Sequence, residues 1–335
     1  VTSAMSGVTN ELIKKAGQIS KNFTNSERDV LLSTGEQMAS ALIAGKLCDF
    51  GFDSRSWMSW QIPIITRGNY SSARIIKIGT NQLKKYLKKG GTPIITGFQG
   101  LNKESRLTTL ERGGSDASAI MLAKFFKAKR CIIYTDVDGV YTTDPNLIKK
   151  AKKIKALSYE EMLEMSSLGS KVMQPASIQD AKLNKVKIDV KSSFTNKTGT
   201  QIIGRKKIKD TNIIRGVSFT KNNAKVSLLG VKDKPGVAAA IFEPLYKNSV
   251  NVDMVVQNIS SIGKETDLTF TIKTEDLKKT KKIIQENKSI NYRKLLFEKG
   301  VSKISVIGVG MITTPGVTFR TVSYTHLTLP TIYSV

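Results

Sequence analysis

Hydrophobic and polar positions follow two different periods along the first two-thirds of the chain. Short apolar runs bounded by glycine or charged residues predict buried β-strands at "GTPIITGF" (91–98), "KRCIIYT" (129–135) and "KIDVKSSF" (187–194). Between them, residues 115–128 are apolar on most faces, which predicts a buried helix. A second helix is predicted at 158–172, where Ser158 and Glu161 have the spacing of a capping box. Strands alternating with helices predict an α/β fold with a largely parallel sheet.

The pattern changes after about Ile213. Residues 224–260 read as strand, turn, helix and strand. Residues 267–274 then alternate apolar and polar side chains, as a half-buried strand does, and 276–287 have the spacing of an amphipathic helix. This order predicts a β-α-β-β-α unit of the ferredoxin-like type. The positions expected to face its core are Leu268, Phe270, Ile272, Leu277, Ile283 and Ile284.

The second pattern begins to repeat near the end of the chain. "VSLLGVKDKPGV" (226–237) matches "ISVIGVGMITTPGV" (304–317), and the second copy stops after Phe319. The predicted organisation is an α/β domain at 1–205, a first ferredoxin-like unit at 223–298, part of a second unit at 213–222 and 302–319, and an unrelated, non-native tail at 320–335.

Composition excludes several classes of protein. The single histidine, His326, argues against a histidine-based triad or a multi-histidine metal site, and two cysteines cannot form a disulfide framework. Cys131 lies in an apolar run and is expected in the core. No apolar run has the length to span a membrane and no leader pattern opens the chain, so we expect a cytoplasmic protein without membrane contact.

The net charge of +26 raises nucleic-acid binding as one interpretation. The lysines are spread along the chain, however, and aromatic residues are not interleaved with them as in a stacking platform. We therefore expect no nucleic-acid partner, and a basic surface that attracts small anions is the alternative.

Candidate chemistry lies in separate loops, since neither G-x-x-x-x-G-K-[ST] nor G-x-G-x-x-G occurs. Small residues at 3–10 leave room for an anion, and Glu36 follows a glycine at what reads as a helix start. Arg112 in "RGGSD" has a planar fork suited to a carboxylate, next to helix N-terminal amides. The remaining candidates are Thr135, Asp136, Asp138 and Asp144 in "YTDVDGVYTTDP" and Lys171 in "LGSKVMQP".

Each candidate also has a purely structural interpretation. Ser115 or Asp116 can cap the helix that follows them. Glu36 can be a solvated helix residue, Arg112 can pair with Glu111, and Lys171 can be one of many surface lysines. Two further candidates can be turn residues: Asp138 with Gly139, and Asp144 with Pro145.

Taken together, the motifs resemble those of the aspartate kinases, members of the amino-acid-kinase family. "VTSAMSGVTNEL", "STGEQMASAL", "GFQGLNKESRLTTLERGGSDASA", "YTDVDGVYTTDPN" and "EMLEMSSLGSKVMQPASI" occur in the family's order, and "DKPGVAAAIF" with "VDMVVQNIS" resembles its ACT regulatory domain. The resemblance covers residues 1–319. It implies an amino-acid-kinase-type sandwich with a largely parallel central sheet, followed by ferredoxin-like βαββαβ ACT domains.

The resemblance also implies an activity: ATP-dependent phosphorylation of the β-carboxylate of L-aspartate to 4-phospho-L-aspartate, the first step toward lysine, threonine and methionine. ATP and Mg²⁺ would be the cofactors, with no metal-ligand set in the protein itself. Lysine or threonine, or both, would act as feedback effectors, and the ACT domains would hold a homo-oligomer together. Fusion to a dehydrogenase is left open.

Site residues follow from the same resemblance, position by position. Catalytic roles fall to Asp116 and Arg112, and aspartate binding to Ser3, Thr9, Glu36, Arg112 and Ser115. Nucleotide binding falls to Thr135, Asp136, Tyr141, Asn146, Lys171 and Val172. The effector would contact Asp233, Gly236, Ala238, Gln257 and Asn258.

The chain departs from the family in four places, one of which is the second ACT unit that stops after Phe319. Family members begin with a strand carrying K-[FY]-G-G-[ST]-S, and this sequence starts after it, so we expect an N-terminally truncated chain and leave its activity open. Asn146 stands where the family often has arginine, and Gln174 where many members have histidine or leucine. Two alternative functions stay open: another amino-acid kinase, such as a glutamate or uridylate kinase, which the ACT repeat argues against, and a non-catalytic amino-acid-sensing regulatory chain.

Overall fold

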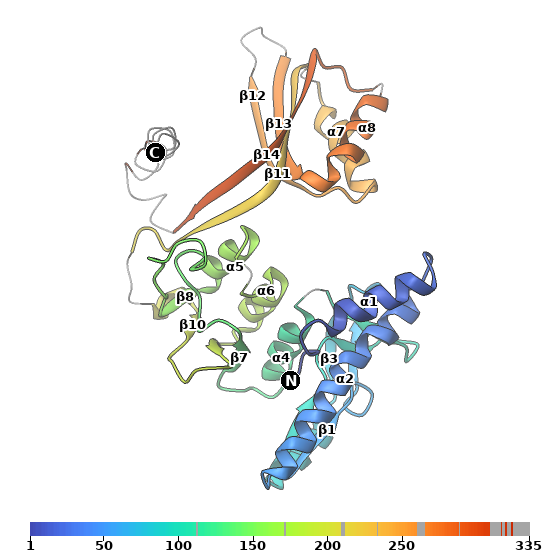
Figure 1. Ribbon diagram of the computed structural model, residues 1–335, viewed down its shortest axis with the longest axis vertical. Coiled ribbons are helices and arrows are strands. Elements are labelled where there is room, and N and C mark those ends of the chain that lie inside the picture. Colours follow the sequence, from blue (N-terminus) through green and yellow to red (C-terminus); the bar gives the residue numbers. More distant parts are fainter. Residues whose placement is uncertain are drawn as a thin grey trace. The chain divides into compact units, whose positions relative to one another are not determined.

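The computed structural model describes residues 1–111, 113–170, 172–208, 212–232, 234–259, 265–287, 289–308, 316, 319 and 323. The chain forms two compact units (Figure 1). The first unit consists of Val1–Gly216 together with Ile307–Val335, and the second of Val217–Val306.

The first unit alternates helices and strands, as the sequence predicts. Its helices are α1 (Val8–Ile19), α2 (Asn25–Asp49), α3 (Asn81–Lys88), α4 (Gly114–Phe125), α5 (Tyr159–Ser167) and α6 (Pro175–Asn184), with a 3₁₀ turn at Arg205–Lys207. Its strands are β1 (Ser54–Trp57), β2 (Ile64–Arg67), β3 (Arg74–Ile78), β4 (Thr92–Ile95), β5 (Gln99–Leu101), β6 (Leu107–Thr109), β7 (Cys131–Thr135), β8 (Ala156–Ser158), β9 (Ile188–Ser192) and β10 (Thr200–Ile203).

Four of the seven pairs of named strands in this unit are parallel. The strand orders are β1-β4, β3-β2-β5-β6 and β7-β9-β10-β8. The pairs β1–β4, β2–β5, β7–β9 and β8–β10 are parallel, and β2–β3, β5–β6 and β9–β10 are antiparallel. The prediction of an α/β fold with largely parallel sheets is confirmed.

Helix α4 contributes to both apolar cores of the first unit. Its Ile120 belongs to the cluster built around β7, β9 and α5, whereas its Met121 and Leu122 belong to the cluster around β1, β2 and α3. A helix between two cores needs apolar residues on most faces, which is the pattern that the sequence shows. Cys131 is buried in the first of these cores, as expected.

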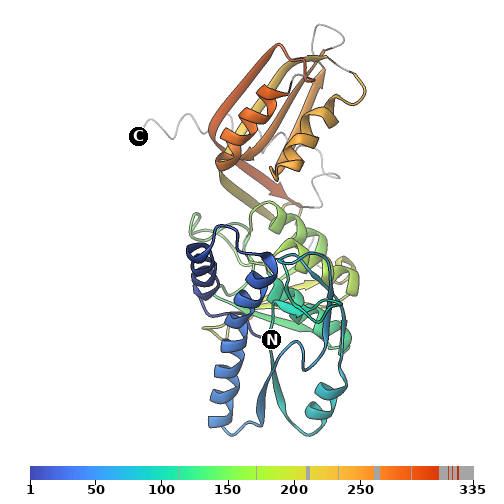
Figure 2. The same cartoon turned by 90° about the vertical axis from the view of Figure 1, so that its right-hand side faces the viewer.

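Helix α2 is the long blue helix in Figure 2, and it buries polar residues. It packs along β1, β4 and β6. Its buried polar residues are Asp29, Ser33, Glu36 and Ser40. Their spacing of three and four residues places them on one helix face. The prediction that Glu36 opens a helix is wrong, because the helix begins eleven residues earlier at Asn25.

The second unit is a four-stranded sheet with both helices on one face (Figure 1). Its elements are β11 (Gly216–Lys232), α7 (Val237–Lys247), β12 (Val252–Ile259), β13 (Glu265–Lys273), α8 (Leu277–Glu286) and β14 (Lys294–Ile307), with a 3₁₀ turn at Thr274–Asp276. The strand order is β12-β13-β11-β14. The predicted core positions all face this core, with Ile283 half-buried and the rest buried, which confirms the ferredoxin-like pattern.

The boundary between a first and a second ACT unit stays a prediction. The segment 213–222 and the first strand of 223–298 share one continuous strand, β11, and β14 runs on to Ile307. Most of 309–335, including His326 and nearly all of the predicted non-native tail, lies outside the described residues. Among the helices that the structure describes, none has the length and apolarity to cross a membrane.

Candidate active site

Two glycines open helix α4 at the "RGGSD" motif. Gly113 is the residue before the helix and has a left-handed backbone (φ 75°), and no side chain caps the helix. The interpretation of Ser115 or Asp116 as a helix cap is therefore wrong. A Cβ on Gly113 would overlap Gln174, and one on Gly114 would lie 2.7 Å from Phe98 Cδ2. The glycines are required because neighbouring segments approach the backbone closely.

The loop after β4 brings Ser115 to the beginning of the chain. A Cβ on Gly97 would lie 2.8 Å from Ser115 Oγ and 2.7 Å from the carbonyl oxygen of Thr2. The Gly97 amide donates to that carbonyl at 3.0 Å, and Thr2 pairs with Thr96 in a parallel bridge. Thr2 thus adds a bridge next to the end of β4, and Ser115 lies against Gly97 in the loop that follows.

Glu36 joins the same group of segments through the backbone of Ala4. The Ala4 amide donates to Glu36 Oε1 at 3.0 Å. Gly35 allows this approach, since a Cβ there would lie 2.9 Å from Ala4 Cβ. Ser3 is exposed beside this contact, and Thr9 is half-buried in the first turn of α1. Ser3 is thus adjacent to the residue that bonds Glu36, and Ser115 is linked to the same segment through Gly97 and Thr2; their grouping as one binding site stays a prediction.

The Glu36 carboxyl group is buried and only half satisfied. It is 4% exposed, and its Oε2 accepts no hydrogen bond from the residues that the structure describes. Burial raises the pKa of Glu36 to about 7. The hydrogen bond from the Ala4 amide lowers this pKa in part, because it stabilises the ionised form. The alternative of a solvated helix residue is wrong. A buried carboxylate with one free oxygen is suited to a cationic group of a ligand.

Asp116 lies in the first turn of α4 and is half-buried. Burial raises its pKa to about 6. The negative charge of Asp116 also contributes to raising the pKa of the Cys131 thiol, after the larger effect of burial on that thiol. Two carboxyl groups with raised pKa values, Glu36 and Asp116, therefore flank the segments gathered around Gly97 and Ser115.

A second group of predicted residues follows β7. Thr135 and Ser192 are register partners at the ends of the parallel strands β7 and β9, so both chains leave the sheet at its carboxyl edge. Ligands of α/β sheets bind at this edge. Thr135 Oγ1 donates to Asp136 Oδ1 at 3.1 Å, and Asp136 is exposed.

The loop after Asp136 is held by its own side chains. The Tyr141 hydroxyl donates to Asp138 Oδ1 at 2.6 Å, and Lys153 Nζ lies 3.3 Å from Asp138 Oδ2. The hydrogen bond from Tyr141 is the main cause that lowers the pKa of Asp138, with Lys153 adding to it. Asp138 is thus a partner of the predicted nucleotide residue Tyr141 and not an isolated turn residue.

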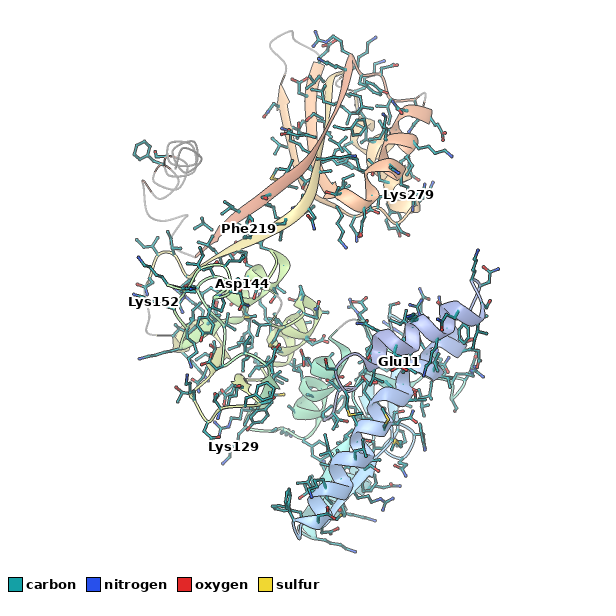
Figure 3. The ribbon with its side chains drawn as sticks, in the orientation of Figure 1. Glu11, Lys129, Asp144, Lys152, Phe219 and Lys279 are labelled. Carbon is teal, nitrogen blue, oxygen red and sulfur yellow. The ribbon has the colours of Figure 1, made fainter. Side chains whose placement is uncertain are left out.

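The loop turns again at Asp144, which Figure 3 labels together with Lys152. Asp144 Oδ1 accepts from the amide of Asn146 at 2.9 Å, as a turn residue does, and Asn146 is exposed. Val172 is half-buried and packs against the apolar core of the first unit, so its side chain supports the fold.

The "RGGSD" loop also contacts the start of helix α6. Ser177 Oγ donates to the carbonyl oxygen of Gly113 at 3.1 Å, and Gln174 packs on Gly113. The "RGGSD" loop is therefore in contact with the residues that directly follow the "LGSKV" motif. Arg112 and Lys171 lie outside the described residues, and so does Asp233.

The predicted effector residues that are described lie on the surface of the second unit. Gly236 precedes α7 with a left-handed backbone (φ 88°), and Ala238 follows in the first turn of that helix. Gln257 and Asn258 lie on β12, an edge strand of the sheet. All four are exposed.

Sequence reasoning missed Asp29, which is fully buried in α2. Its carboxylate accepts hydrogen bonds from Ser71 and Thr109. One signal could have found it: Asp29 precedes Glu36 by seven residues, which places both carboxyl groups on one face of a helix. The assumption that a helix begins near Glu36 hid this relation.

No group of three or more histidine, cysteine, aspartate or glutamate side chains in the described part of the chain is arranged to hold a metal ion. Mg²⁺ in phosphoryl-transfer enzymes is commonly bound by nucleotide phosphates, water and one or two carboxylates.

Comparison with known proteins identifies relatives over nearly the whole chain. Residues 1–192 match the model of the amino acid kinase family, and residues 226–287 match an ACT domain model. The aspartokinase of Bacillus sp. strain MGA3 is 39% identical over 318 residues, covering 95% of this chain and 77% of the relative. The aspartate kinase of Pseudomonas putida is 40% identical over 319 residues, with the same coverage.

Solved structures give the same result. Escherichia coli aspartokinase III in complex with lysine and aspartate is 26% identical, with a TM-score of 0.71, and the match covers 89% of this chain and 68% of that one. The aspartate kinase from Synechocystis is 32% identical, with a TM-score of 0.55, over 96% of this chain and 56% of that one. The chain therefore belongs to the amino acid kinase family and, within it, to the aspartokinases.

Proposed function

We propose that this protein transfers the γ-phosphoryl group of ATP to the β-carboxylate of L-aspartate, giving 4-phospho-L-aspartate and ADP. The observation that carries the proposal is the buried Glu36 carboxyl group, whose Oε2 is free among the described residues and whose Oε1 accepts from Ala4, two residues after the bridge of Thr2 to Thr96. The aspartokinases at about 40% identity and the E. coli enzyme solved with aspartate support it.

Two of the three charged groups of aspartate have a proposed partner in this chain. The free oxygen of Glu36 would pair with the ammonium group, which needs a buried anion. Arg112 would bind a carboxylate of the substrate through its planar fork. Ser3, Thr9 and Ser115 would line the same pocket and supply hydroxyl groups.

The phosphoryl transfer requires that the two substrates are positioned and that the negative charge of the phosphates is neutralised. The attacking group is a carboxylate, which is already ionised near neutral pH, so no general base is needed. A β-carboxylate oxygen bonds to the γ-phosphorus while the bond from that phosphorus to the β,γ-bridging oxygen breaks, and ADP leaves with the electron pair. Asp116 would orient cationic groups around the phosphates, and Lys171 would neutralise phosphate charge.

The nucleotide would lie at the carboxyl edge of β7 and β9. Thr135, Asp136 and Tyr141 would contact it, with Asn146 and Val172 at the periphery of that site. Mg²⁺ would bind together with the nucleotide. Asp116 would be the carboxylate that orients the ion around the phosphates. The ion would supply positive charge to the phosphate oxygens.

The second unit would bind lysine or threonine and join copies of the chain. Gly236, Ala238, Gln257 and Asn258 are exposed and available to an effector, and Asp233 is proposed with them. Strand β12 is a sheet edge with exposed apolar side chains at Met254, Val255 and Val256. An edge of this kind favours pairing with a second copy.

The test is a coupled assay of ADP release with aspartate, with glutamate and without acceptor. It is run on this chain and on a version extended in front of Val1 by a K-F-G-G-T-S strand. We expect release that depends on aspartate in the extended version, with glutamate near background. Absence of aspartate-dependent release from both versions would contradict the kinase proposal and favour an amino-acid sensor, which lysine and threonine binding would then test.

A further inference from the structure

Asp29 is a buried residue of the first unit whose carboxylate accepts four hydrogen bonds. Its side chain is fully buried. Oδ2 accepts from the backbone amides of Ser71 at 2.8 Å and Thr109 at 2.7 Å. Oδ1 accepts from the hydroxyls of the same two residues at 2.7 and 2.8 Å. One carboxylate thereby joins α2 to two segments that are far away in sequence.

The two partners of Asp29 have different places in the fold. Ser71 lies in the turn between β2 and β3, with a left-handed backbone (φ 63°) that is uncommon for serine. Thr109 ends β6, is 1% exposed, and stands three residues before Arg112 and seven before Asp116. The hydrogen bonds to Thr109 therefore fix the point from which the "RGGSD" loop departs.

Helix α2 holds β6 at both ends. Glu27, in the first turn of α2, forms an ion pair with Arg106, which directly precedes β6. Asp29 bonds Thr109 at the other end. Glu36 lies two turns further along the same helix face, about 10 Å from Asp29 along the axis. The same rigid helix therefore carries Glu36 and anchors the strand that leads to Arg112.

We propose that Asp29 is a positioning residue for aspartate binding: through Thr109 it sets the "RGGSD" loop in place relative to Glu36. The proposal rests on the proposed function of Glu36 and Arg112 as the two sides of the aspartate pocket. Burying a carboxylate destabilises a protein unless its oxygens accept hydrogen bonds. The Asp29 carboxylate accepts two of its hydrogen bonds from Thr109, at the end of the strand that leads into the proposed site.

The test compares variants that each lose one hydroxyl group. Thr109→Val removes a hydrogen bond to Asp29 and keeps the backbone amide bond. Thr108→Val is the matched control, because Thr108 lies in the same strand, is equally buried at 1% exposed, and bonds Thr66 at 2.6 Å in place of Asp29. Thr109→Ser retains the hydroxyl and serves as the rescue variant.

Two readouts are taken from each variant: dissociation constants of aspartate and of ADP by titration calorimetry, and hydrogen–deuterium exchange of peptides covering 110–118. We expect Thr109→Val to weaken aspartate binding by about fivefold or more, the effect of one lost hydrogen bond, with ADP binding within about twofold of wild type. Exchange across 110–118 should rise. Thr108→Val should change neither readout, and Thr109→Ser should restore both.

The outcomes separate the two proposals. If Thr109→Val leaves aspartate binding and exchange at wild-type values, or if Thr108→Val changes them equally, the positioning role of Asp29 is overturned. If the wild-type protein binds no aspartate, the proposed function fails, and exchange alone decides on Asp29: unchanged exchange in Thr109→Val overturns its role, and raised exchange that is absent from Thr108→Val supports it.

Discussion

At the scale of single residues, helix α2 carries one buried carboxylate with hydrogen bonds to both oxygens and one with a hydrogen bond to a single oxygen among the described residues. Asp29 accepts four hydrogen bonds, whereas Glu36 accepts one at Oε1 and leaves Oε2 free among the described residues. Both are on the same face of α2. A carboxylate whose oxygens all accept hydrogen bonds within the protein is suited to a structural role. A carboxylate oxygen without such a bond is suited to accept one from a ligand.

The raised pKa of Glu36 predicts that aspartate binding depends on pH near neutrality. The ionised form binds the ammonium group, and with a pKa of about 7 Glu36 loses that charge as the pH falls through 7. We expect aspartate affinity to be near its maximum above pH 8 and to fall toward tenfold per unit below pH 7. Titration calorimetry between pH 6 and 8.5 measures it.

Glu36→Gln is the matched variant for that titration, because glutamine keeps the shape and cannot ionise. It should bind aspartate weakly, with an affinity that no longer changes between pH 6 and 8.5. A wild-type affinity independent of pH, or a Glu36→Gln variant that keeps the full pH dependence, would contradict the assignment.

At the scale of elements, glycines decide which segments can meet. Gly35 and Gly45 both lie inside α2, but a Cβ on Gly35 would lie 2.9 Å from Ala4 Cβ and 3.3 Å from Val8 Cγ1, whereas one on Gly45 would meet no atom within 4 Å. We expect Gly45→Ala to stabilise the protein by about 0.5–1 kcal/mol, since alanine restricts the unfolded chain and meets open space.

Gly35→Ala should have the opposite effect, because its Cβ would press on Ala4 and move the amide that bonds Glu36. Urea unfolding of both variants measures the two free energies of unfolding, and aspartate titration measures the site. Equal stabilisation by both substitutions would show that Ala4 can move at no cost, against the packing described here.

Local patterns predict much of the fold, and their failures have physical causes. The strands at β7 and β9, the helices α4 and α8, and the capping box of Ser158 with Glu161 follow from periodicity and capping, and the structure confirms them. The start of α2 was missed because Gly35 reads as a helix boundary when its contact with Ala4 is unknown. Asp29 was missed because its partners, Ser71 and Thr109, are far away in sequence.

In the candidate site, too, local motifs predict some features, and others depend on contacts between distant segments. Motif order predicted that Ser3, Glu36 and Ser115 belong together, and the contacts through Ala4 and Gly97 agree with that grouping. Their roles toward a ligand stay predictions. What periodicity could not reveal is the free oxygen of Glu36, since hydrogen-bond satisfaction depends on tertiary packing.

At the scale of the whole molecule, two units divide the proposed tasks. The first holds the proposed kinase site and the second offers an exposed sheet edge, β12. Val255 is 48% exposed on that edge. If copies of the chain pair there, Val255→Lys should shift the protein toward monomer, because it places a charge in the interface.

Tyr246→Lys is the control, since Tyr246 is 81% exposed on α7 of the same unit and away from the sheet edge. Sedimentation velocity over a range of concentrations measures the shift. A wild-type protein that is monomeric throughout, or equal dissociation by both variants, would remove β12 from the interface.

The central claim is that the β-carboxylate of aspartate receives the phosphoryl group. Trapping the product with hydroxylamine tests it most directly, because an acyl phosphate forms a hydroxamate whose position reports which carboxylate was phosphorylated. With ATP, Mg²⁺ and aspartate, the version carrying the K-F-G-G-T-S strand should give β-aspartyl hydroxamate, in an amount equal to the ADP formed. ADP without hydroxamate, or a hydroxamate only from glutamate, would contradict the account.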